Sequence, residues 1–163
     1  MNACEALRAS MDAPTMIVNS YLGDLSDADL LVRPVEGANH IAWQLGHLIS
    51  TENKMIDAVC PGSMPPLPEG FAEKHTTETA GSDDASDFLT KDEYTQLAAE
   101  QRSAMLAALE SLSDDDLSGA APESTPEFVP TVGAVFSMMP THWVMHAGQW
   151  AVIRRKLGRP PLF

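Results

Sequence analysis

Leu, Ile, Val and Met residues recur at helical spacing in four separate stretches of this chain, and no stretch alternates convincingly between apolar and polar residues as a half-buried strand does. Such a chain is restricted to folds in which helices pack on helices, because each helix has one apolar face that must be buried. Its 163 residues suit one core of ordinary size. The sequence therefore predicts a single all-α domain over residues 1–163, folded as a four-helix bundle.

Capping and helix-breaking residues mark the ends of the four expected helices. The first should cover residues 4–22, where Pro14 either kinks the helix or marks its true start. The second should run to residue 59 from the N-cap Asn39. The third begins with a capping box at Thr90, and the fourth covers residues 131–156.

The connections between these helices carry two further signals. Residues 61–90 are rich in Pro, Gly, Ser, Thr and acidic residues and exceed most connections in length, so we expect a long crossover between the second and third helices. The segment LSDADL at residues 25–30 recurs as LSDDDL at residues 112–117, each time between two helices. This repeat indicates either two related helical hairpins or a common way of opening a short helical turn.

The charge of the chain excludes one class of partner. The sequence has 23 Asp and Glu residues against 10 Lys and Arg residues, a formal net charge of −13. A surface this acidic repels phosphate, so we expect no nucleic-acid partner. Hydrophobic residues make up 44% of the sequence, which is enough to form a core in spite of the charge.

Cysteine content and apolar segments indicate a cellular location. Only Cys4 and Cys60 are present, too few for a disulfide framework, and we expect both to be packing residues. The N-terminal segment lacks the basic region and apolar run of a secretory signal, so a cytoplasmic location is expected. Residues 132–153 carry no formal charge, but they include histidines and a proline, and we expect a buried bundle helix there and no membrane span.

His142 and His146 are the residues that point most directly to chemistry. Four residues on a helix advance about 400°, so the two imidazoles lie one turn apart on nearly the same side and can bind one metal ion. Both lie in an apolar stripe, so a ring without a metal needs a hydrogen-bond partner inside the bundle. The pair does not belong to an H-E-x-x-H zinc protease, because Trp143 stands where that motif has its glutamate.

A third metal ligand must come from another part of the chain. The expected second helix offers His40 in its first turn and His47 in its rigid middle, and we favour His47. At 100° per residue, however, His47 lies about 120° from the centre of the apolar stripe, on the flank of the helix. Glu52 lies within that stripe, where an acidic side chain is rare unless it is paired or ligating. Glu52 is therefore a candidate fourth ligand, imidazole hydrogen-bond acceptor or general base, with a surface-edge carboxylate as the alternative.

Two segments far apart in the chain carry motifs that occur together in a known family. Residues 39–48, with the sequence NHIAWQLGHL, resemble the second-helix motif of the DinB-like (DinB/YfiT) superfamily. Residues 142–149 match H-x-x-x-H-x-G-Q and are followed by Arg154 and Arg155, which resembles the fourth-helix motif of the same superfamily. The resemblance covers nearly the full length of the chain, except that residues 61–90 contain no family motif.

The resemblance implies a four-helix bundle that holds a divalent metal ion, commonly zinc or nickel, with three histidines. Carried over to this sequence, the ligands are His47, His142 and His146, which places His47 in the site and not on a flank. Related proteins include transferases and isomerases that use low-molecular-weight thiols such as bacillithiol or mycothiol, and dimers are common. The expected partners are therefore a small-molecule substrate, a thiol and a second copy of the chain.

Three imidazole ligands leave a coordination position open for water or substrate, which is typical of catalytic metal sites. A metal ion there would activate a thiol or water without using either cysteine of the chain. Two alternatives stay open. In the first, the protein is not catalytic, and the metal ion or a hydrogen-bonded histidine cluster only stabilises the bundle or binds a ligand. In the second, the protein is an interaction protein without a metal, and the histidines form a polar core bonded to protein carbonyl or carboxylate groups.

Three further expectations concern residues outside the motifs. His75 lies in the polar crossover and is expected to be exposed. The three tryptophans, Trp43, Trp143 and Trp150, are expected in the core or at interfaces. Four basic residues between 154 and 159 suit the negative pole of a helix C-terminus, with capture of a carboxylate on a cofactor or partner as the alternative.

Overall fold

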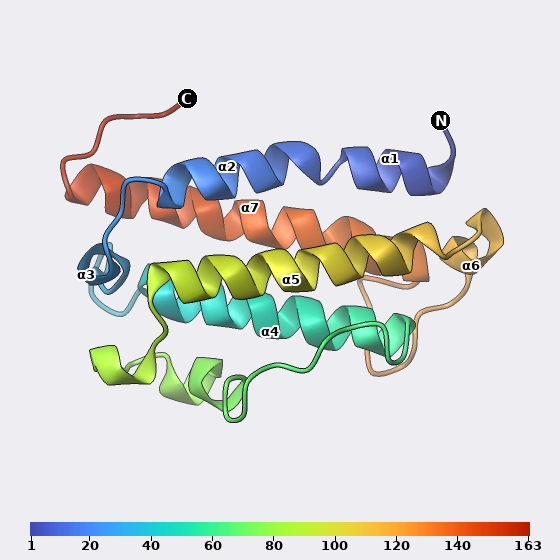
Figure 1. The fold of residues 1–163 in the computed structure, drawn as a ribbon, viewed down its shortest axis with the longest axis horizontal. Coiled ribbons are helices and arrows are strands. Elements are labelled where there is room, and N and C mark those ends of the chain that lie inside the picture. Colours follow the sequence, from blue (N-terminus) through green and yellow to red (C-terminus); the bar gives the residue numbers. More distant parts are fainter.

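Helices account for the regular structure of residues 1–163 in the computed structural model, apart from one isolated antiparallel bridge between Ala120 and Thr131. Four helical rods lie side by side along the long axis of the molecule (Figure 1). In chain order they are α1 (Ala3–Ala9) followed by α2 (Asp12–Leu22), then α4 (Ile41–Val59), α5 (Lys91–Glu110) and α7 (Val132–Lys156). The predicted all-α four-helix bundle is thus confirmed.

The first rod is divided into two helices just before Pro14, close to the predicted alternative in which Pro14 marks a helix start. Helix α1 ends at Ala9, and α2 begins at Asp12, so that Pro14 is the third residue of α2. A proline is tolerated in the first turn, where backbone N–H groups have no intrahelical acceptor, but in a continuous helix its ring would clash with the carbonyl four residues earlier. The expected single helix over residues 4–22 is therefore wrong, and two shorter helices take its place.

Polar side chains cap the helices close to the predicted positions. Helix α5 begins after Thr90, whose hydroxyl accepts the N–H of Glu93 while the Glu93 carboxylate accepts the N–H of Thr90. Helix α4 is capped by His40, whose Nδ1 accepts the N–H of Trp43 at 3.1 Å, so the predicted N-cap Asn39 is wrong by one residue. Here a histidine nitrogen accepts the N-cap hydrogen bond that a side-chain oxygen usually accepts.

The repeated LSD segments open two short helices, α3 (Asp27–Leu30) and α6 (Asp114–Ser118). Each begins with a capping box between a serine and the aspartate three residues later, Ser26 with Asp29 and Ser113 with Asp116. Leu30 and Leu117 are buried in the two cases. Each copy of the repeat thus forms the same local structure, a short capped helix at which the chain turns between two long helices.

The long crossover between α4 and α5 lies along the bundle (green in Figure 1) and contains three single 3-10 turns, η1 (Glu73–His75), η2 (Thr77–Thr79) and η3 (Ala85–Asp87). His75 is 3% exposed, so the predicted exposure of this residue is wrong. Its Nδ1 lies 2.7 Å from the carbonyl of Phe71 and its Nε2 lies 2.8 Å from the hydroxyl of Tyr94. Gly46 on α4 makes room for the ring, because a Cβ at that position would come within 2.1 Å of it.

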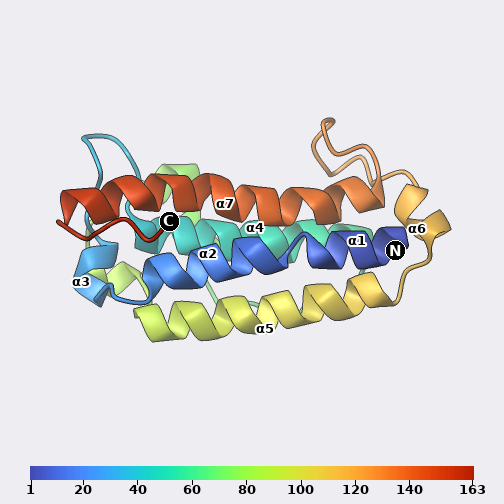
Figure 2. The same cartoon turned by 90° about the horizontal axis from the view of Figure 1, so that it is seen from above.

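The rods form a ring in which α2 packs on α7, α7 on α4, and α4 on α5 (Figure 2). Trp43, Trp143 and Trp150 are buried, as predicted. No helix of the structure combines the length and apolar character that crossing a membrane requires, including the uncharged part of α7. The contact between α4 and α7 brings together the two helices that carry the histidine motifs.

Candidate metal centre

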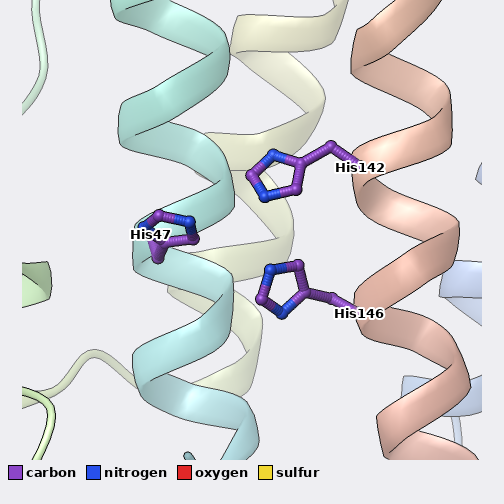
Figure 3. Close-up of side chains that lie close together, drawn as sticks. All are labelled: His47, His142 and His146. Atoms are coloured by element: carbon purple, nitrogen blue, oxygen red, sulfur yellow. The ribbon is translucent and has the colours of Figure 1, made fainter. Parts of the chain in front are cut away.

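The structure brings together three histidines from helices far apart in the sequence. His47 lies in the middle of α4, and His142 and His146 lie one turn apart on α7. One ring nitrogen of each residue lies within 4.8 Å of the others. The ring centroids are 5.2 Å apart for His47 and His142, 5.5 Å for His47 and His146, and 4.9 Å for His142 and His146. Figure 3 shows the three rings pointing toward one another across the space between α4 and α7.

His40, the other histidine considered as a third ligand, lies outside this cluster. Its Nδ1 caps α4 and its Nε2 lies 3.0 Å from the carbonyl of Ser82. Both ring nitrogens are therefore engaged by the backbone. His47, in contrast, lies with His142 and His146 and is half-buried at the edge of the core, as its position on the flank of the apolar stripe suggests.

A buried glutamine determines which nitrogen of His146 faces the cluster. The Oε1 atom of Gln44 lies 2.9 Å from Nδ1 of His146 and accepts the indole N–H of Trp150 at 2.8 Å. The amide Nε2 donates to the carbonyl of Asn39 at 2.7 Å, which fixes the orientation of the amide group. Because Oε1 can only accept, Nδ1 of His146 must carry the proton. The lone pair of Nε2 is then free to bind a metal ion.

The other two rings make no hydrogen bond to the protein. His47 stacks on Trp43 with 5.1 Å between ring centroids and 6° between ring planes, which holds the ring in place without using a nitrogen. His142 contacts the other two histidines edge-on. Of the three rings, only His146 is buried and has a hydrogen-bond partner within the protein, whereas His47 and His142 are half-buried and keep their nitrogens free.

Burial lowers the pKa of all three histidines. The pKa of His142 and that of His146 fall to about 4, because burial disfavours the charged ring and the neighbouring histidines add repulsion. The pKa of His47 is lowered by burial as well. All three rings are therefore neutral at pH 7, which is the form that binds a metal ion.

This donor set suits a divalent transition metal. Imidazole nitrogen is a common ligand of zinc, nickel and copper, and three such ligands on two packed helices are held with little freedom. Three protein ligands also leave a coordination position for water or a substrate. The residues present therefore fit the metal ion that the sequence motifs imply.

The structure does not bring Glu52 to the three histidines. Its carboxylate is 1% exposed and accepts hydrogen bonds from Nη2 of Arg102 and from the indole N–H of Trp143, both at 2.8 Å. It contacts no imidazole nitrogen through a hydrogen bond. Burial raises the pKa of this carboxyl, against the opposing effects of Arg102 and the two hydrogen bonds. Its position in the core agrees with the sequence pattern, but its partners come from α5 and α7 and not from the cluster.

Gln44 is the functional candidate that sequence reasoning missed. It is fully buried on α4 between Trp43 and Leu45. The available signal was a polar amide in an otherwise apolar turn, three residues before His47. Its partner on α7 is about a hundred positions away, so no local pattern identifies the contact.

Three of the four basic residues between 154 and 159 make hydrogen bonds or ion pairs with other parts of the protein. Arg154 is 2% exposed, pairs with Asp24 and donates to the carbonyl of Tyr21 at 2.9 Å. Arg159 pairs with Asp29 at 3.2 Å, and Lys156 donates to the carbonyl of Arg33 at 2.8 Å. These contacts tie the C-terminal end of α7 to the segment around α3.

Comparisons with known proteins agree with the architecture. A crystal structure of a conserved protein from Enterococcus faecalis has a TM-score of 0.73 to this chain at 16% sequence identity, and the alignment covers 98% of this chain and 99% of that one. At this identity the likeness concerns the fold. No curated protein matches the sequence. The family model described as the DinB superfamily matches residues 12–150, which is most of the chain, and the protein therefore belongs to the DinB superfamily.

Proposed function

We propose that this protein is a metal-dependent enzyme in which His47, His142 and His146 hold one divalent ion, zinc or nickel, and a small thiol or water is activated for transfer, isomerisation or hydrolysis. The observation that carries the proposal is the convergence of three neutral imidazoles within 4.8 Å, two of them without any hydrogen bond to the protein. A divalent transition-metal ion requires neutral nitrogen donors whose lone pairs are not already used in hydrogen bonds within the protein.

The chemistry divides between the ion and the chain. A bound divalent ion lowers the pKa of a coordinated thiol or water toward neutrality and so supplies a nucleophile. Gln44 holds the His146 ring in the ligating tautomer, and Trp43 holds the plane of His47 by stacking. Neither cysteine belongs to the histidine cluster, and the proposed chemistry uses neither of them. Cys4 donates to the carbonyl of Leu109, and burial raises the pKa of Cys60, which disfavours its thiolate.

Metal analysis tests the first half of the proposal. Protein purified without chelators should contain about one divalent ion per chain, and alanine variants of His47, His142 or His146 should each lose it. The matched control is His40→Asn, which removes a histidine outside the cluster but keeps a side chain able to cap α4. Wild-type protein that binds no divalent ion, or a control that loses the ion equally, would refute the site.

A thiol-transfer assay tests the second half. Wild-type protein is assayed with several small thiols against one electrophilic acceptor, together with His47→Ala, and thermal unfolding is recorded with and without chelator. For an enzyme, the variant should keep its folded helical spectrum while the activity is lost. In the alternative, a non-catalytic bundle stapled by its metal ion, chelation or loss of His47 should lower the unfolding temperature strongly and no thiol should be consumed.

The same proposal includes the setting in which the protein works. Both cysteines are free, which suits a reducing cytoplasm, and the net charge of −13 disfavours nucleic acid as a partner.

A homodimer is proposed because dimers are common in the family that the motifs resemble. Light scattering on the metal-loaded protein at several concentrations tests the dimer, and a monomeric mass throughout would refute it.

A further inference from the structure

Gln149 lies on the side of α7 that carries the two α7 histidines of the cluster, which project toward α4 in Figure 3. It follows His142 by seven residues and His146 by three, so the three side chains lie within about 60° of one another around the helix axis. Along the axis, Gln149 is about 4.5 Å, or nearly one turn, beyond His146. It is exposed, and it is the next polar side chain after the two histidines on this side of the helix.

Contacts in the core determine which end of the Gln149 amide faces outward. Nε2 of Gln44 donates to the carbonyl of Asn39, which can only accept, and Oε1 of Gln44 accepts from the indole of Trp150, which can only donate. The second hydrogen of Gln44 Nε2 is directed to Gln149 at 3.2 Å, so the Gln149 atom at this contact must be the acceptor Oε1. Nε2 of Gln149, with two N–H donors, makes no hydrogen bond to the protein.

The contact with Gln44 distinguishes Gln149 from an ordinary surface glutamine. A free glutamine side chain loses rotamer freedom when it binds a ligand, and this loss weakens binding. Oε1 of Gln149 is already held by a buried amide whose two donors and two acceptor positions are all in use. The N–H donors of Gln149 are therefore positioned beside the histidine cluster before any ligand arrives.

The two ends of the cluster on α7 offer different chemistry. One turn before His142 lies Met138, whose thioether sulfur cannot donate a hydrogen bond, whereas one turn after His146 lies the uncharged donor of Gln149. Residues 132–153 carry no formal charge, so this part of α7 has no cation that would attract an anionic group. The group that suits an uncharged N–H donor is a neutral acceptor such as a carbonyl oxygen.

We propose that Gln149 determines specificity at the metal site, where its Nε2 group donates a hydrogen bond to a carbonyl oxygen of the molecule that occupies the open coordination position. The inference rests on the proposed function, because it requires an ion with an open position. It narrows the substrate class to small molecules that carry a carbonyl group close to their metal-binding atom. Gln149 contacts this molecule and not the ion.

The test compares two thiols of matched length on the full-length protein loaded with cobalt. Methyl 3-mercaptopropanoate carries a carbonyl oxygen, and 1-pentanethiol has the same chain length without one. Both bind the ion through sulfur, and the thiolate-to-cobalt absorption band follows each titration. The ratio of the two dissociation constants isolates the carbonyl group, because the metal–sulfur bond and the charge are common to both ligands.

Gln149→Glu is the decisive variant. A carboxylate oxygen can still accept the N–H of Gln44, but the outward group can no longer donate. We expect the preference for the ester over 1-pentanethiol to fall about fivefold from the wild-type value, as for the loss of one ordinary hydrogen bond. Gln149→Leu should lower this preference to a similar extent. The control Met138→Leu, at the other end of the cluster, should leave it unchanged.

A second readout uses neither cobalt nor a reaction. In two-dimensional NMR of the zinc-loaded protein, the side-chain amide resonances of Gln149 are identified by their loss in Gln149→Leu. We expect these resonances to shift saturably on addition of the ester and much less on addition of 1-pentanethiol. The side-chain amide of Gln44, which is buried behind Gln149, should respond equally to both thiols.

An ester preference that is the same in the wild type and in Gln149→Glu would overturn the inference. A loss of preference confined to Gln149→Leu would overturn it as well, because Gln149 would then serve only as a partner of Gln44. Failure of the proposed function gives a different result. A chain that takes up no ion, or a cobalt-loaded protein that binds neither thiol, would refute the open metal site itself, and this inference with it.

Discussion

At the scale of single residues, the histidine cluster depends on one amide group. Gln44 joins α4 to α7 through the His146 imidazole and the Trp150 indole, and it is fully buried. Hydrogen bonds from a second residue to a metal-binding histidine fix its ring and its tautomer. Gln44 therefore acts on the proposed metal site as a positioning residue, without touching the ion.

Replacement of Gln44 by leucine should affect metal binding more than folding. We expect a loss of about 10- to 100-fold in affinity for zinc. We expect a loss of about 1–3 kcal/mol in the free energy of unfolding, because the indole N–H of Trp150 loses its acceptor. Competition with a chromophoric chelator measures the affinity, and ¹⁵N NMR of the metal-free protein reports the tautomer of His146. A variant that keeps both the tautomer and the zinc affinity would show that Gln44 has no such role.

At the scale of elements, the crossover between α4 and α5 is held by buried contacts that its polar composition does not predict. His75 in η1 bonds to Tyr94 of α5 and lies against α4 at Gly46, where the absence of a Cβ is essential. The ring of His75 also packs against Phe71, with 4.6 Å between centroids. Close approach of the crossover to α4 therefore depends on one glycine.

Gly46→Ala should destabilise the protein by about 2 kcal/mol or more, although alanine favours the helix, because the added methyl group would clash with the His75 imidazole. The matched control is Gly148→Ala on α7, where the new Cβ would meet nothing within 4 Å, and this change should leave stability the same or raise it slightly. Urea unfolding of both variants makes the comparison. Equal stabilities would mean that the crossover does not pack as described.

At the scale of the whole molecule, the buried neutral histidines make stability depend on pH. In the unfolded chain a histidine titrates near pH 6.5, whereas in the folded protein the pKa of His142 and that of His146 are about 4. Between these values the unfolded chain binds protons that the folded chain does not bind. The stability that these two groups contribute is therefore complete above about pH 6.5 and is lost as the pH falls toward 4.

Comparison of the metal-free wild type with His142→Gln/His146→Gln isolates this effect. Both proteins contain the same carboxylates, so the difference between their pH profiles comes from the two histidines. We expect the wild type to lose more unfolding free energy than the double variant between pH 7 and pH 4.5, with chelator present throughout. Urea unfolding at each pH measures the free energy of unfolding. Parallel pH profiles of this free energy in the two proteins would contradict the burial of neutral rings.

Local chemistry was sufficient to predict much of this protein. Apolar periodicity identified the helical rods, and the capping box at Thr90 and the repeated LSD segments were placed correctly, because these signals depend on residues three or four positions apart. The one-turn spacing of His142 and His146 is of the same kind. The fold class and the position of the histidine pair on one side of a helix are therefore predictable from short-range sequence patterns.

Tertiary contacts decided the rest. Whether His47 faces the pair on α7 depends on how α4 and α7 pack, and periodicity alone left it on the flank of its helix. The burial of His75 depends on Gly46, and the carboxylate of Glu52 is held by Arg102 and Trp143 on two other helices. The spacing of residues along a helix sets only which side of that helix a side chain occupies. Its distance to a side chain on another helix, and so the chemistry the two can share, is set by the packing of the helices.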